Sequence, residues 1–136
     1  MNAETIAIPA ASRRSWAGYI VSALPVIFLL MDAFGKFIKP EAVVIGTADL
    51  GYQESVIVPL GVTLLVCTVL YLVPRTSVLG AVLLTGYLGG AVATHVRIAN
   101  PLFTHQLFPV YLGALLWLGL WLRDARVREL IAFRRG

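Results

Sequence analysis

The stretch GYLGGAVATHVRIANPLFTHQLFP, residues 86–109, combines the features that predict the fold. It starts as a glycine-rich apolar helix, passes through His95, Arg97 and Asn100, and returns to apolar residues at Pro109. A bilayer excludes such polar side chains from its centre, so their position between two apolar segments marks the end of a membrane span. The stretch therefore predicts two transmembrane helices that concentrate polar residues at one membrane surface.

The composition extends this prediction to the whole chain. Of its 136 residues, 59% are hydrophobic and 13% are charged, whereas a soluble domain carries about 25% charged residues. The formal charge is +4, but the basic residues flank apolar segments, so membrane topology explains them and nucleic-acid binding is not expected. Because Cys67 is the single cysteine, an internal disulfide and a multi-cysteine metal cluster are excluded within one chain.

Four apolar segments are long enough to cross a bilayer, which predicts an all-α, integral membrane four-helix bundle formed by one domain, residues 1–136. The expected helices cover residues 16–38, 54–73, 77–98 and 106–123, and a basic tail over 124–136 follows them. The first apolar run is too long for a signal peptide, and the tail is expected to touch anionic lipid. Residues 40–53 are too short to span and are expected to form a short surface helix or loop.

The basic residues are distributed unevenly between the two sides of this bundle. Lys36, Lys39 and Arg97 lie on one side. The other basic residues lie on the opposite side: Arg13, Arg14, Arg75, Arg123, Arg126, Arg128, Arg134 and Arg135. Because the side richer in lysine and arginine faces the cytoplasm, both termini are expected to be cytoplasmic, in a multi-pass protein of the bacterial inner membrane.

The outward side collects polar residues from several helix ends, and these are expected to form a ligand-binding pocket. The candidate residues are Asp32, Lys36, Glu54, His95, Arg97 and His105. Lys36 and Arg97 could hold an anion or a carbonyl oxygen, and His95 could exchange protons near neutral pH. The alternative is a closed network of two ion pairs, Asp32 with Lys36 and Glu54 with Arg97. A metal site is not expected, because the spacing of the two histidines matches no local ligand motif.

Small residues form ridges on the third expected helix. Gly86, Gly90 and Thr94 make one ridge, and Gly89 with Ala93 makes a second. Such ridges let a neighbouring backbone approach closely. They could serve packing inside the bundle or a homo-oligomer through Gly86 and Gly90.

Short motifs at the helix ends carry a resemblance to a known family. They are Phe34-Gly35-Lys36-Phe37, Pro74-Arg75-Thr76, the glycine-rich run over 79–91, His95-Val96-Arg97, Asn100-Pro101-Leu102-Phe103, Leu107-Phe108-Pro109-Val110-Tyr111 and Leu122-Arg123-Asp124. With them the chain resembles the DoxX-like family of small four-helix membrane proteins over nearly its whole length. The family name comes from a membrane subunit associated with quinone-linked oxidation of sulfur compounds, and distant eukaryotic relatives act as assembly chaperones.

Three functions are compatible with these features, and no catalytic residue set emerges. The first is a small-molecule-binding or accessory subunit that has an outward-facing polar pocket and no catalysis of its own. The second is the membrane subunit of a quinone-linked oxidoreductase, which would need a redox protein partner because the chain contains no recognisable redox centre. The third is a membrane scaffold or assembly chaperone that acts through its glycine ridges.

Overall fold

The structure is a computed structural model that describes residues 10–132, of which 86% are helical. The elements in chain order are α1 (Ala10–Ile38), α2 (Glu41–Asp49), the 3-10 helix η1 (Glu54–Val56), α3 (Ile57–Leu72), α4 (Ser77–Arg97), the π-helical turn η2 (Leu102–Gln106), α5 (Phe108–Arg123) and α6 (Ala125–Ile131). Residues 10–132 contain no strand. The predicted all-helical fold is therefore confirmed.

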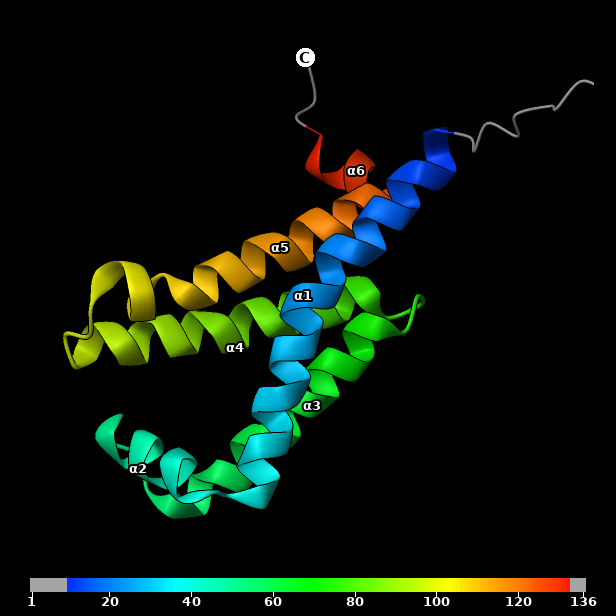
Figure 1. The fold of residues 1–136 in the computed structure, drawn as a ribbon. Helices are drawn as coiled ribbons and strands as arrows, with labels where there is room; N and C mark the ends of the chain where they lie inside the picture. Colours follow the sequence, from blue (N-terminus) through cyan, green and yellow to red (C-terminus); the bar gives the residue numbers. More distant parts are fainter. Residues whose placement is uncertain (1–9, 133–136) are drawn as a thin grey trace, which may run out of the picture.

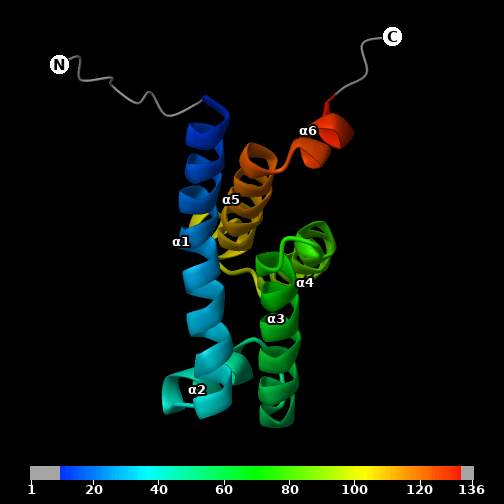
Figure 2. The same ribbon diagram turned by 90° about the vertical axis from the view of Figure 1, so that its right-hand side faces the viewer.

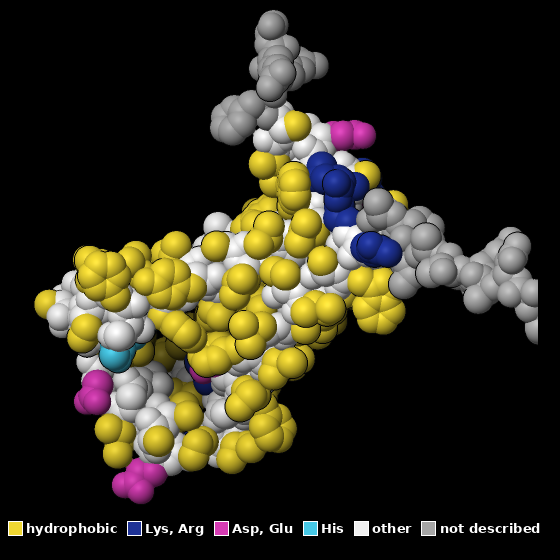
Figure 3. Space-filling view, turned by 45° about the horizontal axis from the view of Figure 1, so that its top comes forward, with side chains coloured by type: hydrophobic (Ala, Val, Ile, Leu, Met, Phe, Trp, Pro, Cys, Tyr) yellow, Lys and Arg dark blue, Asp and Glu magenta, His cyan; other side chains and the backbone are white. Residues whose placement is uncertain are grey.

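Four helical segments are long and apolar enough to cross a membrane. They are Ala11–Ile38, Glu54–Leu72, Ser77–Arg97 and Leu102–Arg123. Large apolar side chains face outward from them: Trp16 is 67% exposed and Leu24 is 68% exposed, and hydrophobic side chains cover most of the face in Figure 3. An apolar surface of this extent requires lipid contact, so the chain is a multi-pass membrane protein.

The four spans form a closed ring, because α1 and α4 each pack against both α3 and α5. The N-terminal turns of α1 and helix α6 lie together at one end, and α2 lies at the other (Figures 1 and 2). We call the first the terminal end; it comprises the start of α1, the α3–α4 turn, the end of α5, and α6. The polar end comprises the end of α1, α2, η1, the end of α4, and η2.

Close glycine contacts hold the terminal end together. A Cβ on Gly119 of α5 would overlap Ser22 Oγ of α1 and lie 2.9 Å from the carbonyl oxygen of Gly18. A Cβ on Gly80 of α4 would overlap the backbone nitrogen of Tyr71 on α3. Both glycines are therefore required where two helix backbones meet.

The buried Tyr71 joins three of the four spans. Its side chain is fully buried, and its hydroxyl donates a hydrogen bond to the Leu116 carbonyl oxygen of α5 at 2.6 Å. The Tyr71 oxygen also lies 2.9 Å from Ser22 Oγ of α1. Since the single phenolic proton is already donated, the Ser22 hydroxyl is the donor in this second bond.

The predicted glycine ridge does not pack inside the bundle. A Cβ on Gly86, Gly89 or Gly90 would meet nothing within 4 Å in the described part of the chain. Of the two uses left open for the ridges, internal packing is therefore not served by these three glycines, and the close approach of α4 occurs at Gly80 instead. The physical reason is the short turn over residues 73–76, which holds the end of α3 close to the start of α4. The two helices diverge with increasing distance from this turn (Figure 1).

The expected basic tail begins with helix α6, and residues 133–136 lie outside the described part of the chain. The Asp124 carboxylate caps α6 by accepting a hydrogen bond from the backbone nitrogen of Arg126 at 2.9 Å. The Arg126 guanidinium donates to the same carboxylate and holds the pKa of Asp124 below its usual range. Val127 is buried and Leu130 is 78% exposed, so α6 docks by one face and presents another.

Candidate functional site

The structure places all six predicted site residues at the polar end. Asp32 and Lys36 occupy the last turns of α1, Glu54 starts η1, His95 and Arg97 end α4, and His105 lies in η2. In Figure 1 the end of α1 and helix α2 lie at the bottom of the view, and the end of α4 with the yellow segment that follows it lies at the left. The six residues divide into separate groups, because no hydrogen bond or ion pair joins one group to another within residues 10–132.

Asp32 and Lys36 form the most enclosed of these groups. The Lys36 amine donates to the Asp32 carboxylate at 2.5 Å, and the two side chains are 15% and 39% exposed, respectively. The Lys36 stem packs against α3 at Gly61, where an added Cβ would lie 2.9 Å from Lys36 Cβ. The predicted pair is therefore confirmed, as expected for an acid four residues before a base on one helix face.

Glu54 pairs with a lysine that the sequence did not point to. Its carboxylate lies 3.4 Å from the Lys39 amine, at an exposed position. The predicted Glu54–Arg97 ion pair is therefore wrong. The chain reverses between α1 and α2, with Lys39 at φ 51°, and this reversal presents its amine to η1.

Arg97 instead fastens the segment that follows α2. Its Nη2 donates to the Leu50 carbonyl oxygen at 2.6 Å, and its guanidinium lies over the Tyr52 ring at 5.8 Å. The physical reason is that the carbonyl groups at the end of a helix lack intrahelical donors and attract a cation. Gly51 adopts φ +82° between these residues, and a Cβ there would lie 3.1 Å from Arg97 Nη2.

The two histidines form a group across α4 and η2. The rings of His95 and His105 meet edge to face with centroids 5.8 Å apart. His95 Nδ1 lies 2.7 Å from Asn100 Nδ2, and His105 Nδ1 lies 2.8 Å from Thr104 Oγ1. Because an amide nitrogen only donates, His95 Nδ1 is the acceptor and its proton lies on Nε2. Residues 10–132 contain no group of three or more histidine, cysteine or acidic side chains suited to a metal.

Sequence reasoning did not include Tyr52 among the site residues. Its hydroxyl lies 2.9 Å from Thr94 Oγ1 on α4, and Thr94 Oγ1 donates to the Gly90 carbonyl oxygen at 2.9 Å. Together with the Arg97 contacts, this bond ties the loop after α2 to α4. A tyrosine directly after a loop glycine was the available signal, since a phenol at a membrane surface seeks a polar partner for its hydroxyl.

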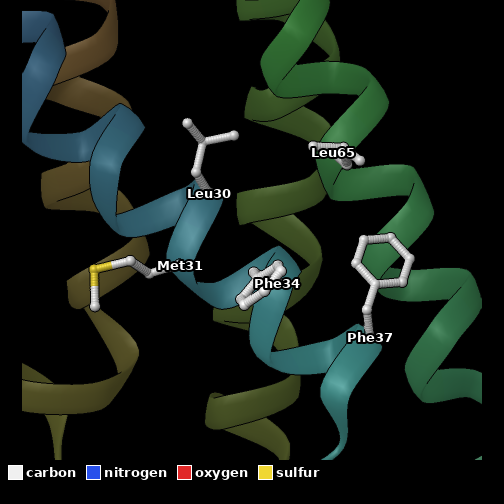
Figure 4. A pocket seen from close by; sticks show the side chains of 5 residues that line it. All are labelled: Leu30, Met31, Phe34, Phe37 and Leu65. Carbon is white, nitrogen blue, oxygen red and sulfur yellow. The ribbon is translucent and has the colours of Figure 1, made fainter.

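One groove near this end is apolar. It has a volume of about 430 Å³ and lies between α1 and α3 (Figure 4). It is lined by Leu30, Met31, Phe34, Phe37 and Leu65. None of the six predicted site residues lines this groove. Its apolar lining suits an acyl chain better than a polar ligand. Figure 3 also shows a hollow near the polar end, in which acidic and basic side chains are visible.

The comparisons with known proteins address the family alone. The family model described as the DoxX-like family matches residues 20–119. This range runs from α1 into α5 and includes every predicted site residue. No curated protein and no solved structure matches the chain.

Proposed function

This chain belongs to the DoxX-like family, and on that premise we propose that it is a small-molecule-binding or accessory membrane subunit with a polar pocket facing outward. The observation that carries the proposal is the Asp32–Lys36 pair. A lysine that is 15% exposed and lies within a membrane-spanning segment costs free energy to bury unless its charge is matched.

The chemistry of the pair suits a ligand with an acceptor oxygen. A lysine amine carries three donor hydrogens, and the Asp32 carboxylate takes one of them. The remaining donors could bind an anion or a carbonyl oxygen, and a quinone carbonyl is one such acceptor. The imidazole rings of His95 and His105 at the same end would supply further hydrogen-bonding groups.

We propose that the pocket faces outward and that both termini are cytoplasmic, because eight basic residues lie on one side and three on the other. The exposed residues Asp49 on α2 and Glu129 on α6 report on the two sides. In a Cys67→Ala background, an impermeant maleimide should label Asp49→Cys in intact bacterial cells and Glu129→Cys only after the membrane is opened. Labelling of Glu129→Cys in intact cells would reverse the orientation.

Ligand binding is tested by native mass spectrometry of protein extracted gently from its own membrane. We expect a reproducible small-molecule adduct whose retention falls at least about tenfold in Lys36→Gln, since a hydrogen bond to a charged group contributes about 1.5–3 kcal/mol. Lys39→Gln is the matched control, because this lysine also pairs with a carboxylate but is 38% exposed. Equal retention in both variants, or a bare wild-type chain, would contradict the proposal.

The open glycine ridge favours a second candidate, a scaffold or assembly chaperone. Gly86, Gly89 and Gly90 leave room for another helix, which could belong to a second copy or to a membrane partner. The same spectra should then show a dimer or a bound membrane protein that Gly86→Ile removes. A retained quinone together with a redox protein would instead support the oxidoreductase alternative.

A further inference from the structure

The terminal end contains a half-buried arginine that the proposed function does not use. Arg123 ends α5, and its guanidinium lies between two aromatic rings, 5.1 Å from the Tyr19 centroid and 4.9 Å from the Tyr71 centroid. Its Nε and Nη2 are buried and have no hydrogen-bond partner among the described residues. The aromatic faces stabilise part of the positive charge, but unpaired N–H groups remain costly to bury.

The neighbouring arginines differ because protein groups satisfy them. The Arg126 guanidinium pairs with the Asp124 carboxylate at 3.1 Å. Arg128 Nη1 donates to the carbonyl oxygens of Trp121 and Leu122 at 2.8 and 3.0 Å. Arg123 therefore holds donor capacity and a positive charge that an anion could match.

A groove on α1 is lined in part by Tyr19, the residue whose ring also contacts Arg123. The groove has a volume of about 520 Å³ and is lined by Ser12, Ser15, Trp16 and Tyr19. Ser15 and Tyr19 are four residues apart and so share one helix face, and the Tyr19 ring also covers Arg123. Hydroxyl donors beside exposed tryptophan and tyrosine rings are typical of the depth at which lipid headgroups lie.

We propose that this groove binds the phosphate of an anionic phospholipid. The Ser12 and Ser15 hydroxyls donate to phosphate oxygens. The Arg123 guanidinium, which lies on the Tyr19 ring and not in the lining of the groove, supplies the opposite charge. Trp16 is 67% exposed and Tyr19 is 55% exposed, so both rings can pack against the lipid's glycerol and upper acyl chains. The groove opens on the surface of a membrane-spanning helix, which favours a lipid over a free anion.

The test measures thermal unfolding of the full chain in detergent after addition of lipid or salt. Phosphatidylglycerol should raise the melting temperature by several degrees, whereas phosphatidylcholine and sodium phosphate should not. Arg123→Gln should abolish the response, and Arg123→Lys should retain part of it. Arg126→Gln is the matched control, because Arg126 is 72% exposed and paired with Asp124, and this variant should respond as the wild type does.

A second variant separates lipid binding from folding. Ser15→Leu removes a hydroxyl and fills the groove while leaving Arg123 in place, so it should lose the phosphatidylglycerol response without a lower melting temperature in detergent alone. Equal stabilisation by sodium phosphate would overturn the lipid assignment in favour of a general phosphate site. An undiminished response in Arg123→Gln and Ser15→Leu, or equal responses to both lipids, would overturn the proposal and leave Arg123 a structural cation.

Discussion

Replacement of Gly80 by alanine is expected to destabilise the bundle by more than about 2 kcal/mol, although alanine normally favours a helix over glycine by about 1 kcal/mol. The reason is that the new Cβ would overlap backbone atoms of Leu70 and Tyr71. Backbone atoms cannot rotate away as a side chain can, so α3 and α4 would have to separate at their turn. Denaturant unfolding of the purified protein in micelles measures this change.

Gly86→Ala provides the control on the same helix. A Cβ at Gly86 would meet nothing within 4 Å in the described part of the chain, so this variant should be as stable as the wild type or slightly more stable. If Gly80→Ala and Gly86→Ala unfold at the same denaturant concentration, the contact between α3 and α4 is not the one described above.

Tyr71→Ala is expected to cost about 3–5 kcal/mol, the range for truncating a buried aromatic residue. It removes a side chain that is fully buried and breaks the hydrogen bonds to Leu116 and Ser22. Because these bonds join α1, α3 and α5, the loss should reduce the cooperativity of unfolding as well as the midpoint. Thermal unfolding followed by circular dichroism in micelles measures both quantities.

Two further variants show whether the cost arises from packing or from hydrogen bonding. Tyr71→Phe keeps the ring over Arg123 and removes only the hydroxyl, so it should cost about 1 kcal/mol. Tyr111→Ala is the control for a tyrosine on an outward surface, since Tyr111 is 45% exposed, and it should change stability little. A Tyr71→Ala variant as stable as Tyr111→Ala would show that Tyr71 is not part of the core.

The histidines and arginines at the helix ends show how far sequence reasoning extends toward the candidate site. These residues lie at the borders of apolar segments in the sequence, so their location at helix ends could be predicted. The Asp32–Lys36 pair could be predicted as well, because the two residues are four apart on one helix. The partners of Arg97 and Glu54 could not be obtained in this way. Arg97 bonds to a carbonyl oxygen 47 residues away, and Glu54 pairs with a lysine 15 residues away across a chain reversal.

The four spans and the all-helical fold could be predicted from the sequence, because length and apolar content decide whether a segment can cross a bilayer. Which glycines lie at helix contacts is visible only in the folded structure, where Gly80 and Gly119 are enclosed and Gly86 is open. The contact of the Arg123 guanidinium with two tyrosine rings is likewise visible only in the folded structure. These features depend on where helices cross, and crossing points follow from the shapes of several side chains packed together, which local periodicity does not encode.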